Sequence, residues 1–242
     1  MAFGDIVQGP YSAAHGSHPQ ITLGVSPTVG NLIVVLQSEV AGESLGDSPL
    51  ATAITYEQTN SVDDVSIFYR VVQGGDGTTW GCTSGNNSVI IAWEVEGPFD
   101  AAPFDVSAGN QGDVDPATQS TGTTAATAQA SEYAVGAITW RNVAGTASGW
   151  TNGFTEVGEG VGSFAALYGA YKVLSSTGTV ETTATLSGTP VGDRAWGCIA
   201  TFKAASGGGG GGSSLRSPGK VYPSGRTPMA IRPSISNRIV IS

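Results

Sequence analysis

The sequence of 242 residues predicts an all-β protein: an antiparallel β-sandwich followed by an extended, non-globular C-terminal arm. Apolar and polar residues alternate through the first 205 residues, and Gly-rich turns separate the alternating segments. No segment has the periodicity of an amphipathic helix. Hydrophobic residues make up 40% of the chain and charged residues only 12%, which suits strands and tight turns and still supplies a core.

Each predicted strand follows from a short run of apolar residues. Ile21, Leu23 and Val25 alternate with other residues, and residues 31–36 are almost continuously apolar, as in a strand that is buried on both faces. Further strands are predicted at residues 65–71, 79–83, 89–95, 133–140, 164–174, 180–186 and 194–203. This spacing indicates about nine or ten strands, which is typical of a sandwich or a barrel.

Charge and composition divide the chain into three parts. Residues 1–206, the predicted sandwich, carry five basic and nineteen acidic groups, a net charge of −14. Residues 207–212 are six consecutive glycines, which predict a flexible linker. Residues 213–242 carry five basic groups and no acidic group. This asymmetry predicts an interaction arm, and the acidic sandwich disfavours nucleic acids and anionic membranes as partners.

The arm is expected to lie across neighbouring protein subunits. Pro218, Pro223, Pro228 and Pro233 recur every five residues and exclude a helix. A backbone that is already extended loses less entropy on docking, while apolar side chains enter pockets and cations pair with carboxylates. A solubilising tail conflicts with the apolar residues, and nucleic-acid binding conflicts with the sparse charge. The expected contact residues are Arg216, Lys220, Tyr222, Arg226, Met229, Ile231, Arg232, Ile235, Arg238, Ile239 and Ile241.

Fragments of catalytic and metal-binding motifs occur, but each is incomplete. Ser48 lies in Gly-Asp-Ser-Pro-Leu, which resembles a hydrolase block, but its chemistry needs a His base and the only histidines are His15 and His18, both before the Ser. Neither further His nor paired Cys accompanies them to complete a zinc site. Cys82 and Cys198, each in Trp-Gly-Cys, are interpreted as buried thiols, with a disulfide between them as the alternative.

The carboxylates are interpreted in the same way. Asp113 and Asp115 could bind Ca²⁺ through their oxygens, although a solvated turn is the simpler interpretation. Glu94, Glu96 and Glu181 could supply paired carboxylates for glycoside hydrolysis, but we interpret Glu94 and Glu96 as the solvent-facing side of a strand. We therefore expect no catalytic residue, no metal site and no cofactor, and we expect a protein that is not an enzyme.

Trp150 and Asn152 form a candidate glycan platform. They lie in Gly-Thr-Ala-Ser-Gly-Trp-Thr-Asn-Gly-Phe, which predicts a loop. An exposed indole beside a carboxamide can stack on a sugar and hydrogen-bond to it. The alternative is that the indole covers one end of the core.

Four stretches of the sequence resemble a jelly-roll-like β-sandwich domain of tailed-phage virion proteins and some bacterial surface proteins. They are GNLIVVLQSEV, VSIFYRVVQGGDGTTW with SVIIAWEVEG, EYAVGAITW, and VGDRAWGCIATFKA, in the order that the family has them. The resemblance spans about 170 residues of the chain, and its motifs consist mainly of core pattern. The glycine run and the arm lie outside this pattern.

The resemblance implies a non-enzymatic virion structural protein of a tailed phage: a surface-displayed decoration protein, a minor capsid protein or a minor tail protein. The expected partners are capsid or tail proteins and further copies of this chain, with no nucleic acid and no membrane. A carbohydrate-binding module that attaches to a host-surface glycan is the alternative. No signal peptide is visible at the N-terminus, and the expected location is the virion, after assembly in the host cytoplasm.

Overall fold

The computed structural model describes residues 1–17, 19–40, 50–57, 63–81, 86–114, 117–141, 144–188 and 194–206. The chain divides into two units, Met1–Gly209 and Gly210–Ser242, and all described residues belong to the first. The predicted linker at 207–212 and arm at 213–242 lie outside the described residues. Among the described residues there is no helix that is long and apolar enough to span a membrane.

The described residues form β-strands joined by turns and loops, and every strand pairing is antiparallel. The predicted all-β antiparallel sandwich is therefore confirmed. The strands are β1 (Ile6–Ser17), β2 (Gln20–Thr22), β3 (Leu32–Val40), β4 (Ala51–Glu57), β5 (Asp63–Val71), β6 (Thr79–Gly81), β7 (Asn86–Val95), β8 (Phe99–Val114), β9 (Thr118–Ser120), β10 (Glu132–Trp140), β11 (Thr146–Ser148), β12 (Thr155–Val161), β13 (Ala166–Val173), β14 (Thr183–Ser187) and β15 (Arg194–Ala204).

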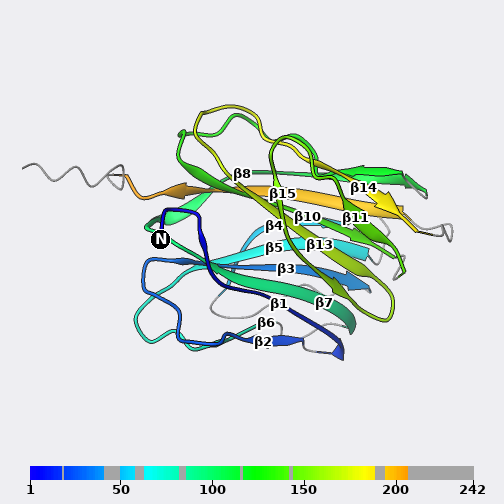
Figure 1. Ribbon diagram of the computed structural model, residues 1–242, viewed down its shortest axis with the longest axis horizontal. Coiled ribbons are helices and arrows are strands. Elements are labelled where there is room, and N and C mark those ends of the chain that lie inside the picture. Colours follow the sequence, from blue (N-terminus) through cyan, green and yellow to red (C-terminus); the bar gives the residue numbers. More distant parts are fainter. Residues whose placement is uncertain are drawn as a thin grey trace, which may run out of the picture. The chain divides into compact units, whose positions relative to one another are not determined.

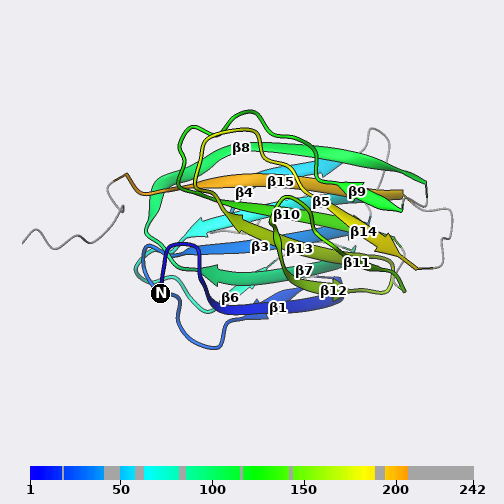
Figure 2. The same cartoon turned by 45° about the horizontal axis from the view of Figure 1, so that its top comes forward.

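The strands are arranged in four layers. The two main sheets have five strands each, in the orders β1-β7-β3-β5-β4 and β12-β13-β10-β15-β8. They pack face to face in the middle of the sandwich (Figure 1). The pair β2-β6 covers the outer face of the first sheet (Figure 1), and the three-stranded sheet β11-β14-β9 covers the outer face of the second (Figure 2). Both main sheets therefore have two buried faces.

The burial of both faces explains the continuous apolar runs in the sequence. Every residue of Leu32–Leu36 is 0% exposed, which confirms the prediction of a strand buried on both sides. All of β10 is buried as well. Between the main sheets, Trp93 of the first sheet donates a hydrogen bond from its indole nitrogen to the Tyr133 hydroxyl of the second, at 3.1 Å. Burying a large aromatic side chain contributes about 2–3 kcal/mol to stability.

The chain folds the same five-stranded motif twice. Residues up to Val95 supply the whole first sheet and residues from Phe99 onward supply the second. When β1, β3, β4, β5 and β7 are matched with β8, β10, β12, β13 and β15, the strand orders of the two sheets are identical. The outer pairs match too, because β2 pairs with β6 as β9 pairs with β14. In the second half β11 is an additional strand.

The register of the pairing is also repeated. Leu32 faces Val71 in the first sheet as Tyr133 faces Val173 in the second, and from each of these pairs the register continues residue by residue along the strands. On their other sides, Leu32 faces Val95 of β7 and Tyr133 faces Phe202 of β15. These pairs give a residue-by-residue match between the two halves.

The match extends to an irregularity. A β-bulge at Ala53 interrupts the pairing of β4 with β5, and a bulge at the equivalent Val157 interrupts the pairing of β12 with β13. Bulges occupy specific positions in a fold, so their coincidence supports the match. The two halves also have similar residues at the ends of β5 and β13, the strands that pair with the bulged strands. Residues 69–72 are Tyr-Arg-Val-Val, and the matched residues 171–174 are Tyr-Lys-Val-Leu.

The halves contact each other reciprocally. Edge strand β1 lies against β12, and its equivalent β8 lies against β4, the equivalent of β12. Ser38 and its own counterpart Thr139 share a buried hydrogen bond between their hydroxyl groups. Contacts between equivalent residues are the property of a two-fold, isologous interface. The sandwich thus has the internal arrangement of a dimer of its two halves.

Candidate ligand pocket

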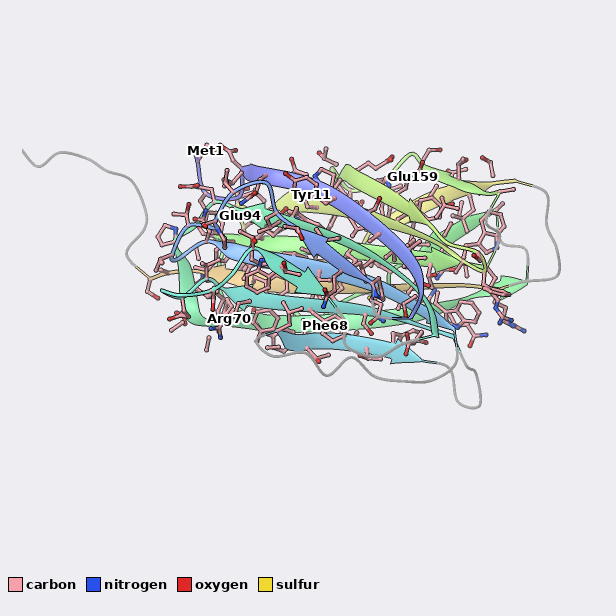
Figure 3. The ribbon with its side chains drawn as sticks, turned by 90° about the horizontal axis from the view of Figure 1, so that it is seen from below. Met1, Tyr11, Phe68, Arg70, Glu94 and Glu159 are labelled. Carbon is pink, nitrogen blue, oxygen red and sulfur yellow. The ribbon has the colours of Figure 1, made fainter. Side chains whose placement is uncertain are left out.

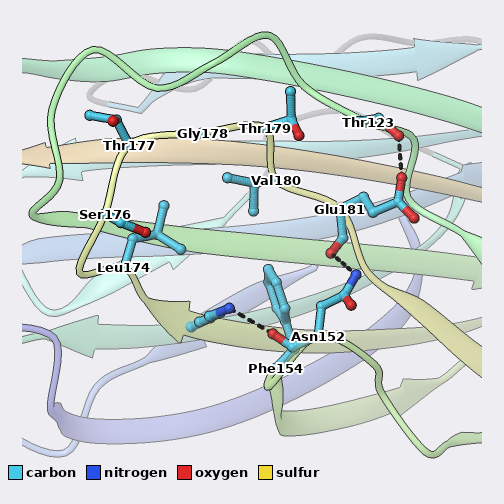
Figure 4. Close-up of a pocket in the computed structure, with 11 residues that line it drawn as sticks. Thr123, Asn152, Phe154, Leu174, Ser176, Thr177, Gly178, Thr179, Val180 and Glu181 are labelled. Carbon is cyan, nitrogen blue, oxygen red and sulfur yellow. Dashed lines mark hydrogen bonds between the residues drawn. The ribbon is translucent and has the colours of Figure 1, made fainter.

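A pocket of about 460 Å³ opens on the second half of the sandwich. Three segments enclose it: the connection from β9 to β10, the loop from β11 to β12, and the connection from β13 to β14 (Figure 4). The lining residues are Thr123, Asn152, Phe154, Lys172, Leu174, Ser176, Thr177, Gly178, Thr179, Val180 and Glu181. Its volume lies in the range of sites for small molecules.

The floor of the pocket is apolar. Phe154, Leu174 and Val180 belong to one core cluster and are exposed by 7%, 8% and 7%. In Figure 4 the ring of Phe154 points toward Val180. The floor is therefore the outer surface of the core, and its shape is fixed by packing beneath it.

Threonines at every third residue hold one wall. Thr121, Thr124 and Thr127 are buried, and each donates its backbone N–H at 3.0 Å to a carbonyl of the connection from β13 to β14. Each also accepts, at its hydroxyl oxygen, the N–H of the same partner residue at 3.2, 3.0 and 3.3 Å. The partners are Thr182, Val180 and Gly178 in that order. This ladder satisfies backbone groups that no sheet pairs, and it fixes the wall.

The loop from β11 to β12 supplies the opposite wall. Asn152 has a φ of +57°, a left-handed conformation that Asn tolerates better than most residues. Its side-chain Nδ2 donates to the Glu181 carbonyl at 2.9 Å, and its own carbonyl accepts from Lys172 Nζ at 2.7 Å. Thr151 holds Thr183 in the same way as the threonine ladder: its N–H donates to the Thr183 carbonyl at 3.0 Å, and its hydroxyl oxygen accepts the Thr183 N–H at 2.9 Å.

The rim carries one charge of each sign. The Glu181 carboxylate accepts a hydrogen bond from the Thr123 hydroxyl, and the Lys172 ammonium donates to the Asn152 carbonyl. An ammonium has three donors and a carboxylate about four acceptor sites, so each group retains capacity for a ligand. The hydroxyls of Thr123, Ser176, Thr177 and Thr179 complete a rim rich in groups that both donate and accept.

Of the two residues of the predicted glycan platform, Asn152 lines the pocket and Trp150 does not. Trp150 lies in a loop, as expected, but its ring packs against two core clusters on the outer face of the second main sheet. A Cβ on Gly136 of β10 would be 3.8 Å from Trp150 Cζ3. The indole nitrogen of Trp150 is buried. In the first half Trp80 packs on the equivalent outer face.

The interpretation of Glu94 as solvent-facing is wrong, because its side chain is 0% exposed. The carboxylate accepts hydrogen bonds from Gln8 Nε2 at 2.5 Å, from the Thr28 N–H at 2.8 Å and from Asn31 Nδ2 at 2.7 Å. Asn31 also accepts from the Gly97 N–H at 2.9 Å (Figure 3 labels Glu94). Several donors satisfy a buried carboxylate well. Glu94 therefore ties together the loop ends of the first sheet.

Glu132 is a second buried carboxyl group that the sequence did not single out. It is 0% exposed, and burial raises its pKa, with the neighbouring Asp105 carboxyl adding to the effect. The Thr201 hydroxyl and the Gln129 N–H, which donates at 3.2 Å, act in the opposite direction. A raised pKa shows that the ionised form of Glu132 is poorly stabilised in the fold.

Other candidates are core residues or lie outside the described part. Cys198 is a buried free thiol whose Sγ lies 3.7 Å from the Val65 carbonyl, and burial raises its pKa. Within the described ranges, no group of three His, Cys, Asp or Glu side chains is placed to hold a metal ion. Outside the described residues or side chains are His15, His18, Ser48, Cys82, Asp113, Asp115 and the whole arm.

No protein-family model, curated protein or solved structure matches this chain.

Proposed function

We propose that this chain is a non-enzymatic structural protein of a tailed-phage particle, displayed at the surface and anchored through residues 213–242 to neighbouring subunits. In this role it is a decoration, minor capsid or minor tail protein. The observation that carries the proposal is the abrupt change at the glycine run. On its N-terminal side are a closed core and a net charge of −14, and on its C-terminal side are a net charge of +5 and regularly spaced prolines.

The closed core supports separate roles for the sandwich, as the displayed module, and for residues 213–242, as the anchor. The inner faces of the two main sheets cover each other, and smaller sheets cover both outer faces. The edge strands of one half lie against those of the other. A core that is covered on all faces opens rarely, which limits proteolysis and suits an exposed module on a particle.

The arm supplies the chemistry of attachment. Ordering about thirty residues costs roughly 1–2 kcal/mol for each, which only an extensive interface offsets. Apolar side chains between prolines provide that area, and Arg and Lys provide charge-assisted hydrogen bonds to carboxylates. Copies of the acidic sandwich or of a capsid subunit are suitable partners.

Deletion of residues 213–242 tests the proposal. We expect the truncated protein to keep its Tm within 2 °C of the full chain, on the order of the shift that a stability change below 1 kcal/mol produces, and to disappear from purified particles. Mass spectrometry of particles quantifies the copies that are retained. A control with the same thirty residues in scrambled order preserves the arm's charge and composition. Incorporation of the truncated protein at the level of the full chain would refute the proposal.

A further inference from the structure

We propose that the pocket formed by Phe154, Lys172, Glu181 and the hydroxyl-bearing residues around them binds a neutral saccharide unit. This site is separate from the arm, and the inference does not depend on how the chain is attached to a particle. It follows from the polarity, charge and rigidity of the lining (Figure 4).

The polarity of the lining matches a sugar ring. A sugar has an apolar C–H face and a rim of hydroxyls that donate and accept hydrogen bonds. The pocket has an apolar floor of Phe154, Leu174 and Val180 and a rim of four hydroxyl-bearing side chains. Groups that can both donate and accept are the complement of a polyol, because each can adopt the role that a ligand hydroxyl leaves open.

The charges favour a neutral ligand. Lys172 and Glu181 contribute one positive and one negative group, so the lining has no net charge. The surrounding sandwich is strongly acidic, which repels an anionic glycan at long range. A zwitterionic amino acid could pair with both charged groups, but it would leave most of the hydroxyl rim without a partner, and unpaired polar groups reduce affinity.

The walls are built before any ligand arrives. The threonine ladder holds the connection from β13 to β14, and Thr151 and Asn152 hold the loop from β11 to β12. A ligand therefore binds without ordering these segments, which lowers the entropic cost. Gly178 has a φ of +152°, and a Cβ there would meet no atom within 4 Å, so this side of the pocket faces open space.

A structural difference between the two halves independently supports the pocket as a specific feature of the second half. Lys172 is the counterpart of Arg70 in the repeated motif. In the first half Arg70 closes the turn after β5 by pairing with Asp76 at 3.1 Å. In the second half the connection after β13 is longer, and the threonine ladder bonds it to the connection from β9 to β10. The pocket lies where the second half departs from the first.

Saturation-transfer NMR on the full chain tests the proposal with glucose, galactose, N-acetylglucosamine, lactose and maltose as probes. Glucuronate and phenylalanine serve as anionic and zwitterionic comparisons. We expect transfer to the C–H protons of at least one neutral sugar. In Ser176→Trp the new side chain fills the pocket from its exposed rim, and the apparent Kd should rise at least about tenfold, equivalent to roughly 1.4 kcal/mol.

Control variants distinguish blocking of the pocket from a general effect of adding a tryptophan. Ser163→Trp makes the same change on the exposed turn between β12 and β13, outside the pocket lining, and should bind like the unchanged protein. Thr177→Trp is a second blocking variant in case Ser176→Trp fails to fold. The proposal is overturned if no neutral sugar receives saturation, if the blocking variants bind as well as Ser163→Trp, or if only glucuronate or phenylalanine binds.

Discussion

The two halves of the sandwich share strand order, register and even a bulge, but they place their buried polar groups differently. At matched positions the first half has Asn31 and Glu94, whereas the second half has Glu132 and Thr201. The carboxylate of Glu94 has three hydrogen-bond donors, whereas the pKa of Glu132 is raised by burial. One backbone motif therefore accepts a carboxyl group on either strand. At Glu132 the effect of burial on the pKa exceeds that of its two donors, the Thr201 hydroxyl and the Gln129 N–H.

The turns after β5 and β13 show the second difference. Arg70 and Asp76 close the first turn, with guanidinium nitrogens 3.1 Å from both carboxylate oxygens (Figure 3 labels Arg70). Lys172, at the matched position, lines an open pocket instead. A short turn that is closed by an ion pair leaves no room for a ligand, whereas a longer connection held by side-chain clamps leaves a cavity. The comparison thus separates the part of the motif that builds the fold from the part that is available for binding.

The largest expected effect on stability comes from placing a carboxyl group at position 31 of the first half, where the second half has Glu132. Asn31→Asp removes the donor to Glu94 and places a second carboxyl group beside it. Two adjacent buried carboxylates cannot both ionise, so we expect the free energy of unfolding to fall by roughly 3 kcal/mol at pH 7. Chemical denaturation at pH 7 and pH 4 measures this, and the loss should shrink at pH 4, because keeping one carboxyl group protonated in the folded state costs less free energy as the pH falls.

Asn31→Ala is the matched control for that variant. It removes the donor and adds no charge, so its cost should be smaller and should depend less on pH than the cost of Asn31→Asp. If Asn31→Asp were as stable as the unchanged protein at pH 7, the structural role assigned to Glu94 would be wrong.

A smaller effect of opposite sign is expected from Glu132→Gln. The folded-state pKa of Glu132 lies above its ordinary value of 4.5, so the folded protein favours the protonated carboxyl group. Stability from this group is therefore present at low pH and is lost as the pH rises through the folded-state pKa. Glutamine cannot ionise, so the variant should have a higher Tm than the unchanged protein at pH 7 and an equal Tm below about pH 4. Calorimetry across this range measures the difference, and a lower Tm at pH 7 would contradict the account.

The smallest effect is expected at the closed turn. The Arg70 guanidinium holds the pKa of Asp76 below its ordinary value, and the Gln73 N–H acts in the same direction against burial. This stabilisation is present at neutral pH and is lost as the pH falls through the folded-state pKa. We expect Asp76→Asn to cost at most about 1 kcal/mol at pH 7, because the pair is partly exposed. Lys172→Met in the second half should cost less, and a reversed order would weaken the comparison.

The sequence predicts the central strands of both main sheets and misses all four edges. Strands β3, β5, β7, β10, β13 and β15 have apolar side chains on both faces, so their pattern is strong. Edge strands β1, β4, β8 and β12 are partly exposed and rich in Gly, Ala and polar residues, so no alternation marks them. The repeated motif is not apparent in the sequence either, because the two halves share their strand pairing but have few identical residues.

Little of the pocket could be predicted. In the sequence, Asn152 stands out only through its proximity to Trp150, whose ring packs on the core. Phe154, Lys172 and Glu181 come from different strands and loops, and only the fold brings them together. The one local signal is the threonine at every third residue from Thr121 to Thr127, which marks a segment that is clamped by side chains rather than paired in a sheet.

The most direct test of the proposed attachment is a photo-cross-link from the arm within assembled particles. Tyr222 is replaced by benzoylphenylalanine, the particles are purified and irradiated, and the cross-linked peptides are identified by mass spectrometry. The account predicts cross-links to a capsid or tail protein, or to another copy of this chain, distinguished by isotope labelling. Cross-links confined to residues 1–206 of the same molecule would contradict it.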